Sequence, residues 1–142
     1  NMKLSSVLML SSCLTLMPAI TQADMAIIVS AKNPNTTLTL DQAEKLFLGK
    51  INAFPDGSTA IPMDLPKGAD RDAFYGKVTG KNSNQLKAYW SKLVFTGSGQ
   101  PPKEAESVQE MLNLVGKNPN LLGYVDKSAV NSSVKVLLSI TD

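Results

Sequence analysis

Apolar residues downstream of position 24 fall into short strand-like runs that alternate with helical patterns, and this alternation restricts the fold more than any other feature. The runs expected as strands are 26–29, 60–65, 121–125 and 134–140. The segments expected as helices are 40–48, 70–78, 83–95 and 105–115. The expected order is a strand, a helix, a strand, three helices and two strands. This order predicts an α/β domain with a small mixed sheet flanked by helices.

Capping residues and glycines support the expected helix boundaries. Thr39 can cap the first helix, which places Leu40, Ala43 and Phe47 on one face, and Gly49 follows its end. Pro62 in the second strand run argues for an edge strand or for the start of a strand.

The clearest helical pattern lies between residues 83 and 95. Its apolar side chains recur at Leu86, Tyr89, Trp90, Leu93 and Val94. We expect this helix, capped by Asn82 or Ser83, to carry the core. Trp90, Tyr89, Phe74 and Tyr75 are expected in the core rather than as a ligand platform. Helical spacing accounts for Trp90 and Phe74, whereas Tyr75 falls on the adjacent face, which leaves an exposed position open for it.

The first 23 residues have the layout of a secretory signal peptide. Lys3 precedes a mostly apolar stretch that ends at Ile20, and Ala23 provides a small residue immediately before Asp24. We therefore expect residues 1–23 to be a cleaved signal, with Asn1 an added residue before Met2, and residues 24–142 to form a single periplasmic domain. The stretch is short and serine-rich for a membrane-spanning helix.

An alternative interpretation makes Cys13 a lipidated cysteine that tethers the domain to a membrane. The apolar run continues beyond Cys13 through Leu14 and Leu16, which fits a cleavable signal better. Because Cys13 is the only cysteine, an intrachain disulfide and a thiolate zinc site are excluded.

Composition excludes several functional classes. The sequence has no histidine, which removes Ser-His-Asp catalysis, Cys-His catalysis and histidine metal sites. We therefore expect no catalytic residue, no metal and no cofactor, and we predict that the protein is not an enzyme. The formal net charge of +2 comes without a basic cluster, so nucleic-acid binding is not expected.

Several motifs occur in the order found in a known family. These motifs resemble periplasmic phosphate-binding proteins of ABC transporters, in particular the short stand-alone members. They are residues 38–43 running into 46–51, residues 86–92 with 95–97, and residues 118–125 (Asn-Pro-Asn-Leu-Leu-Gly-Tyr-Val). The resemblance covers residues 26–126. It implies the fold of one lobe of a type 2 periplasmic binding protein, and phosphate or a similar oxyanion as ligand.

The full-length family is a two-lobed clamp that holds phosphate between the lobes. Its second lobe places an Arg-Ser-Asp-Gly-Ser-Gly-Thr-like stretch between a strand and a helix. The matching stretch here, residues 64–71, keeps only Gly68 and the start of the following helix.

A helix that starts near Gly68 offers free N–H groups and the positive end of its dipole to an anion. The candidate anion-binding residues are Lys67, Gly68, Ala69, Asp70 and Arg71. In the competing interpretation Asp70 is a plain N-cap, which occupies the donors that an anion needs. Asp64 and Asp72 add negative charge at the same place.

Two further hypotheses remain open at this point. Residues 96–99 (Thr-Gly-Ser-Gly) can cradle an anion or form a simple loop between helices. The whole domain is either an exported oxyanion-binding domain that serves a membrane transporter, or a ligand-free module that binds another envelope protein. We expect a homodimer, since a single lobe leaves uncovered the face that its missing companion would cover.

Overall fold

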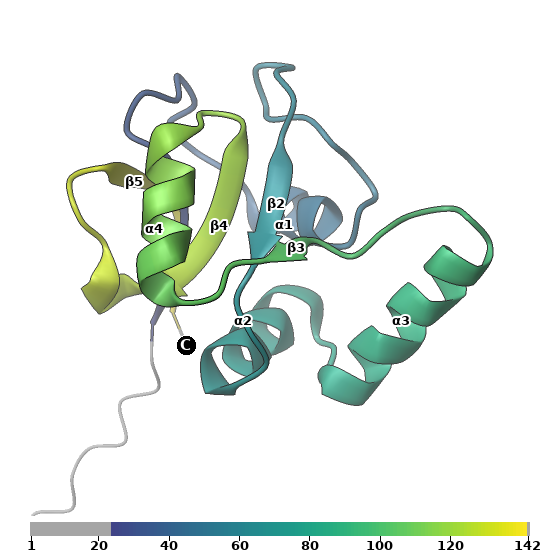
Figure 1. The fold of residues 1–142 in the computed structure, drawn as a ribbon. Helices are drawn as coiled ribbons and strands as arrows, with labels where there is room; N and C mark the ends of the chain where they lie inside the picture. Colours follow the sequence, from purple (N-terminus) through teal and green to yellow (C-terminus); the bar gives the residue numbers. More distant parts are fainter. Residues whose placement is uncertain (1–23, 142) are drawn as a thin grey trace, which may run out of the picture.

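The computed structural model describes residues 24–141, and a five-stranded mixed sheet lies at the centre of this part of the chain (Figure 1). The strands are β1 (Met25–Ser30), β2 (Ile61–Asp64), β3 (Lys103–Glu104), β4 (Leu121–Asp126) and β5 (Val134–Ile140). Their order in the sheet is β3-β2-β4-β1-β5. Strand β1 runs antiparallel to both of its neighbours, whereas β2 is parallel to β3 and β4. The predicted α/β fold with a small mixed sheet is confirmed, and the predicted signal peptide lies outside the described residues.

Helices cover both faces of the sheet. They are α1 (Leu40–Phe47), α2 (Ala69–Thr79), α3 (Ser83–Phe95) and α4 (Val108–Lys117), with a short 3-10 turn, η1 (Lys127–Ala129). Gly123 faces α4, because an added Cβ there would overlap the sulfur of buried Met111. The next residue, Tyr124, points to the opposite face, where it contacts aromatic side chains of α1 and α2. No helix in residues 24–141 is long and apolar enough to cross a membrane.

Local capping explains where the helices begin and end. Thr39 and Gln42 form a reciprocal capping box at the start of α1, and Asn82 with Gln85 does the same for α3. Gly80 ends α2 in the left-handed region at φ 70°, where glycine carries no steric penalty. Gly80 and Asn82 therefore mark the two ends of the short connection between α2 and α3.

The structure corrects two expectations about burial and decides a third. Helix α3 does not carry the core: it stands beside the sheet in Figure 1, and only Leu86 and Trp90 on it are buried. Tyr75, for which an exposed position was left open, is buried, as expected for a core residue. Leu40, the first residue of α1, was expected on the same face as Ala43 and Phe47, but it is exposed whereas they are buried.

The core instead centres on four aromatic rings from α1, α2 and β4. Phe74 stacks on Tyr124 with ring centroids 3.8 Å apart, and Phe47 meets Phe74 edge to face at 4.7 Å. Tyr75 completes the group with an edge-to-face contact to Phe74 at 5.3 Å. This cluster anchors α2 to the sheet and so places the carboxyl end of β2 beside the first turn of α2.

Candidate functional site

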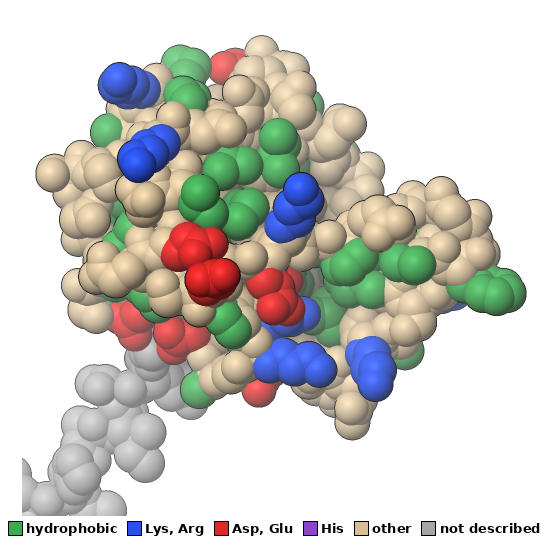
Figure 2. Space-filling model, viewed as in Figure 1, with side chains coloured by type: hydrophobic (Ala, Val, Ile, Leu, Met, Phe, Trp, Pro, Cys, Tyr) green, Lys and Arg blue, Asp and Glu red, His purple; other side chains and the backbone are tan. Residues whose placement is uncertain are grey.

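A cleft of about 580 Å³ lies between α2 and α3. Its lining combines basic, polar and apolar side chains: Lys67, Arg71, Asp72, Tyr75, Lys81, Asn82, Ser83, Leu86, Lys87, Trp90, Ser91, Val94, Phe95 and Pro101. Figure 2 shows hydrophobic side chains over α3 and Lys or Arg side chains close to them. The volume lies within the range of small-molecule sites, which is about 300 to 1,000 Å³.

A buried carboxylate lies directly beneath one wall of this cleft. Asp64, the last residue of β2, is 1% exposed. The hydroxyl of Tyr124 donates to its Oδ1 at 2.6 Å, and the hydroxyl of Tyr75 donates to its Oδ2 at 3.0 Å. The guanidinium of Arg71 lies 3.6 Å from Oδ2. The carboxylate is therefore held by two hydrogen bonds and one opposite charge.

Burial dominates the electrostatics of this group. It raises the pKa of Asp64 above its usual value, while the hydrogen bond from Tyr124, the charge of Arg71 and the hydrogen bond from Tyr75 act in the opposite direction. Burial, followed by the nearby charge of Asp64, also raises the pKa of both tyrosine hydroxyls, so these groups stay protonated as donors. Asp64 and its tyrosines thus form a fixed polar layer under the cleft.

Strand β3, which sequence analysis missed, brings a second carboxylate to Arg71. The parallel register pairs Asp64 with Glu104, and Arg71 Nη1 donates to Glu104 Oε1 at 2.9 Å. With only two residues and exposed side chains, this strand carries no apolar alternation that a sequence pattern could detect. The positive charge of Arg71 is consequently shared between two carboxylates.

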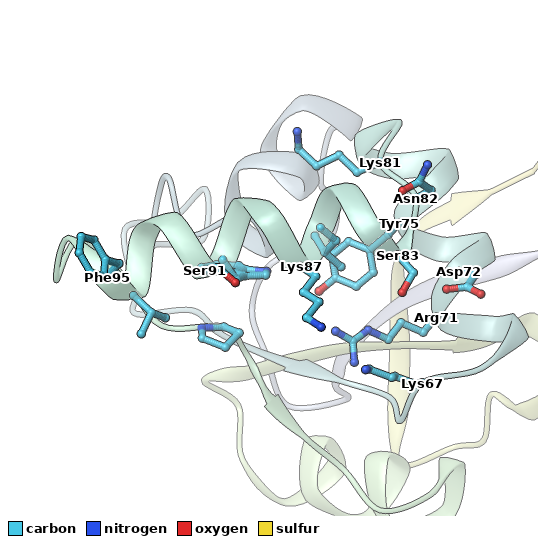
Figure 3. Close-up of a pocket in the computed structure, with 14 residues that line it drawn as sticks. Lys67, Arg71, Asp72, Tyr75, Lys81, Asn82, Ser83, Lys87, Ser91 and Phe95 are labelled. Atoms are coloured by element: carbon cyan, nitrogen blue, oxygen red, sulfur yellow. The ribbon is translucent and has the colours of Figure 1, made fainter.

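Uncompensated positive charge at the cleft comes from lysines. Figure 3 shows Lys67, Arg71 and Lys87 pointing toward one another from two sides of the cleft. Neither Lys67 nor Lys87 forms an ion pair within residues 24–141, and Asp72 is the one acidic side chain in the lining. The Nζ of Lys81 lies over the ring of Tyr89, 5.3 Å from the ring centroid, in a cation–π contact. The rim near α2 therefore favours an anion.

Only two of the five predicted anion-binding residues line the cleft. Lys67 and Arg71 line the cleft, whereas Gly68, Ala69 and Asp70 are not among its lining residues. The interpretation of Asp70 as the N-cap is wrong, because α2 begins at Ala69 and its N-cap is Gly68, with no side-chain cap. Asp70 lies in the first turn, where a carboxylate complements the helix dipole. Lys87, Lys81 and Ser83 were not predicted as site residues.

Residues 96–99 form a loop that closes α3. The amide of Gly97 donates to Val94 O at 3.1 Å, and that of Ser98 donates to Leu93 O at 2.8 Å. These donors are occupied by the end of the helix, so the loop interpretation is confirmed. No group of His, Cys, Asp and Glu side chains that could hold a metal ion is found among the residues that the structure describes.

Together, the sheet order, the helices on both faces and the aromatic core define an α/β domain with the fold of one lobe of a periplasmic binding protein. Solved structures of phosphate-binding proteins share it. A phosphate ABC transporter substrate-binding protein from Clostridium perfringens, solved with bound phosphate, matches with a TM-score of 0.63 and 24% identity over 83% of this chain. An ABC-type phosphate transport receptor from Vibrio cholerae matches with a TM-score of 0.64 and 20% identity over 82% of this chain.

This chain spans less than half of each of those proteins, 46% and 47% respectively. The resemblance predicted from the sequence motifs is thereby confirmed at the level of the fold. No protein-family model and no curated protein sequence matches the chain. The two solved structures are described as a substrate-binding protein and a transport receptor.

Proposed function

We propose that this chain is an exported domain that binds phosphate or a similar oxyanion at the basic rim of the cleft between α2 and α3. The observation that carries the proposal is the excess of cations over carboxylates at this rim, within a fold shared with phosphate-binding proteins. Lys67 and Lys87 would supply charge that no other side chain neutralises, and Arg71 would add a donor already oriented by its carboxylates. The ligand would be handed to a membrane transporter.

The proposed location is the periplasm. It rests on the signal-like pattern of residues 1–23. Expressed with its own leader in a Gram-negative host, the protein is expected in the periplasmic fraction with Asp24 as its first residue. A lipid-modified Cys13 in the intact mass would contradict this proposal.

Titration of the domain with phosphate tests the proposed site. Trp90 is the only tryptophan and lines the cleft, so its fluorescence reports ligand there. We expect micromolar to millimolar affinity that weakens as salt rises, because the cleft is open to solvent. Lys67→Gln and Lys87→Gln should each weaken phosphate binding about three- to tenfold, since each removes one partly screened charge contact.

The matched control is Lys92→Gln, an exposed lysine of α3 outside the cleft lining, which should leave the affinity unchanged. Equal affinities in all four proteins would place the site elsewhere. Sulfate and acetate, titrated in parallel, would define which oxyanions are accepted.

A second candidate function, protein interaction, is favoured by the end of α3. Phe95 is 92% exposed and Val94 is 44% exposed, next to each other on a helix that stands away from the body. Exposed apolar side chains of this kind mark contact surfaces. If two copies pair through them, sedimentation should show a dimer whose dissociation constant rises at least tenfold in Phe95→Ser. A monomer at all accessible concentrations would contradict self-association.

A further inference from the structure

The cleft between α2 and α3 is larger and less polar than an inorganic phosphate requires. Lys67, Arg71 and Lys87 lie together in one part of it, whereas Lys81 lies apart from them (Figure 3). Five apolar side chains form another part of the lining, with the polar Ser91 among them: Leu86, Trp90, Val94, Phe95 and Pro101. A free phosphate presents oxygen on every side and has nothing to gain from these side chains.

The apolar wall follows one side of α3. Leu86, Trp90 and Val94 are spaced four residues apart, so they lie above one another on the same face of the helix. From Lys87 to Phe95 the helix rises about 12 Å. The lining therefore changes from cationic to apolar along α3, over a distance that suits a short organic substituent.

Trp90 in this wall carries a buried donor without a partner. Its side chain is 7% exposed, and its Nε1 has no hydrogen-bond acceptor within residues 24–141. It is the one side-chain nitrogen or oxygen among the described residues in this condition. Buried donors are nearly always paired, so the unpaired indole N–H is a polar exception within the apolar wall.

We propose that the preferred ligand is an organic oxyanion, a phosphate monoester or phosphonate, whose charged head lies among Lys67, Arg71 and Lys87 and whose apolar group lies along α3. This inference rests on the proposed oxyanion function and specifies its ligand class. The basic end selects the charged head, and contact with Val94 and Phe95 distinguishes a substituted oxyanion from the free ion.

Calorimetric titration with inorganic phosphate, hexyl phosphate and hexanol separates the two ends of the cleft. Hexyl phosphate is expected to bind at least about tenfold more tightly than phosphate, because its chain leaves water for the apolar wall. Hexanol, which lacks the charged head, should bind more weakly than hexyl phosphate by a similar factor. The titrations use a concentration at which wild type and variants have the same sedimentation coefficient.

Variants at the exposed part of the wall test the same point without disturbing the core. Val94→Ser and Phe95→Ser should remove most of the advantage of hexyl phosphate and leave the affinity for inorganic phosphate unchanged. Leu40→Ser is the matched control, since Leu40 is 49% exposed and lies outside the cleft lining. It should change neither affinity.

Each outcome gives a distinct answer. If phosphate binds and hexyl phosphate binds equally well, the inference is overturned while the proposed oxyanion function stands. If hexanol binds as tightly as hexyl phosphate, the charged head is irrelevant and the inference is again overturned. If folded protein binds neither phosphate compound, the proposed function fails and the inference fails with it.

Discussion

Replacing Phe74 with Ala is expected to lower the free energy of unfolding by about 3 to 5 kcal/mol, the usual cost of removing a buried phenyl ring. Phe74 is fully buried, stacks on Tyr124 at 3.8 Å and meets Phe47 edge to face at 4.7 Å. The variant therefore loses both apolar burial and favourable ring contacts. Urea denaturation of wild type and variant measures the difference.

Phe95→Ala is the matched control, because it removes the same ring at a position that is 92% exposed. Its unfolding free energy should stay within about 0.5 kcal/mol of wild type. Since the stability of a whole domain is about 5 to 15 kcal/mol, Phe74→Ala could leave a substantial unfolded population at room temperature. A loss below 1 kcal/mol would mean that the aromatic cluster is not the centre of the core.

Local patterns were sufficient to predict most of the secondary structure. The β-branched runs at 26–29 and 134–140 became β1 and β5, and the caps at Thr39 and Asn82 begin α1 and α3. Such signals involve residues close in sequence, so they need no knowledge of the tertiary fold. Strand β3 escaped prediction because its two residues are placed by tertiary contacts, the pairing with β2 and the ion pair of Glu104 with Arg71.

Helix α3 shows where periodicity misleads. Its apolar stripe predicts burial, but periodicity states only that one face is apolar and not what covers it. Here Leu86 and Trp90 meet the body, while Val94 and Phe95 extend into the cleft and solvent. An apolar stripe that is longer than the body it packs against leaves part of its surface for a ligand or a partner.

The candidate site was only partly predictable for a related reason. Lys67 and Arg71 stood out because they flank the start of a helix, but Lys87 comes from another helix and joins them only through the fold. Asp64 was interpreted only as negative charge near the expected anion site. Its position between Met63 and Leu65 in a strand run also indicates a buried carboxylate, and a buried carboxylate needs polar partners. That partner set, Tyr75, Tyr124 and Arg71, assembles from three separate segments.

The Asp64–Arg71 pair changes what substitution of Arg71 should do. Arg71→Ala removes a contact for an anion, but it also removes the only cation within ion-pair distance of Asp64 in the described part of the chain. Removing one partner of a buried pair is strongly destabilising, and the remaining tyrosine hydrogen bonds limit the loss. We expect the free energy of unfolding at pH 7 to fall by about 3 kcal/mol.

The free energy of unfolding should also depend on pH through the titration of Asp64. Because burial raises the pKa of Asp64 in the folded protein above its usual value, the folded protein holds this proton more tightly than the unfolded chain does. The contribution of Asp64 to stability is therefore greatest below its unfolded-state pKa and is lost as pH rises through the folded-state pKa. Arg71→Ala removes one of the effects that lower this pKa, so the loss should extend to higher pH.

A double-mutant cycle with Asp64→Asn isolates the pair. Asp64→Asn in the Arg71→Ala background should restore part of the stability and abolish the added pH dependence, because no carboxylate is then left buried without its cation. We expect a coupling energy of about 2 kcal/mol at pH 7. The exposed Asp41–Lys45 pair, at 3.0 Å, is the control cycle and should give no more than about 0.5 kcal/mol. Equal coupling in the two cycles would show that Arg71 does not compensate a buried charge, and its loss would then affect anion binding alone.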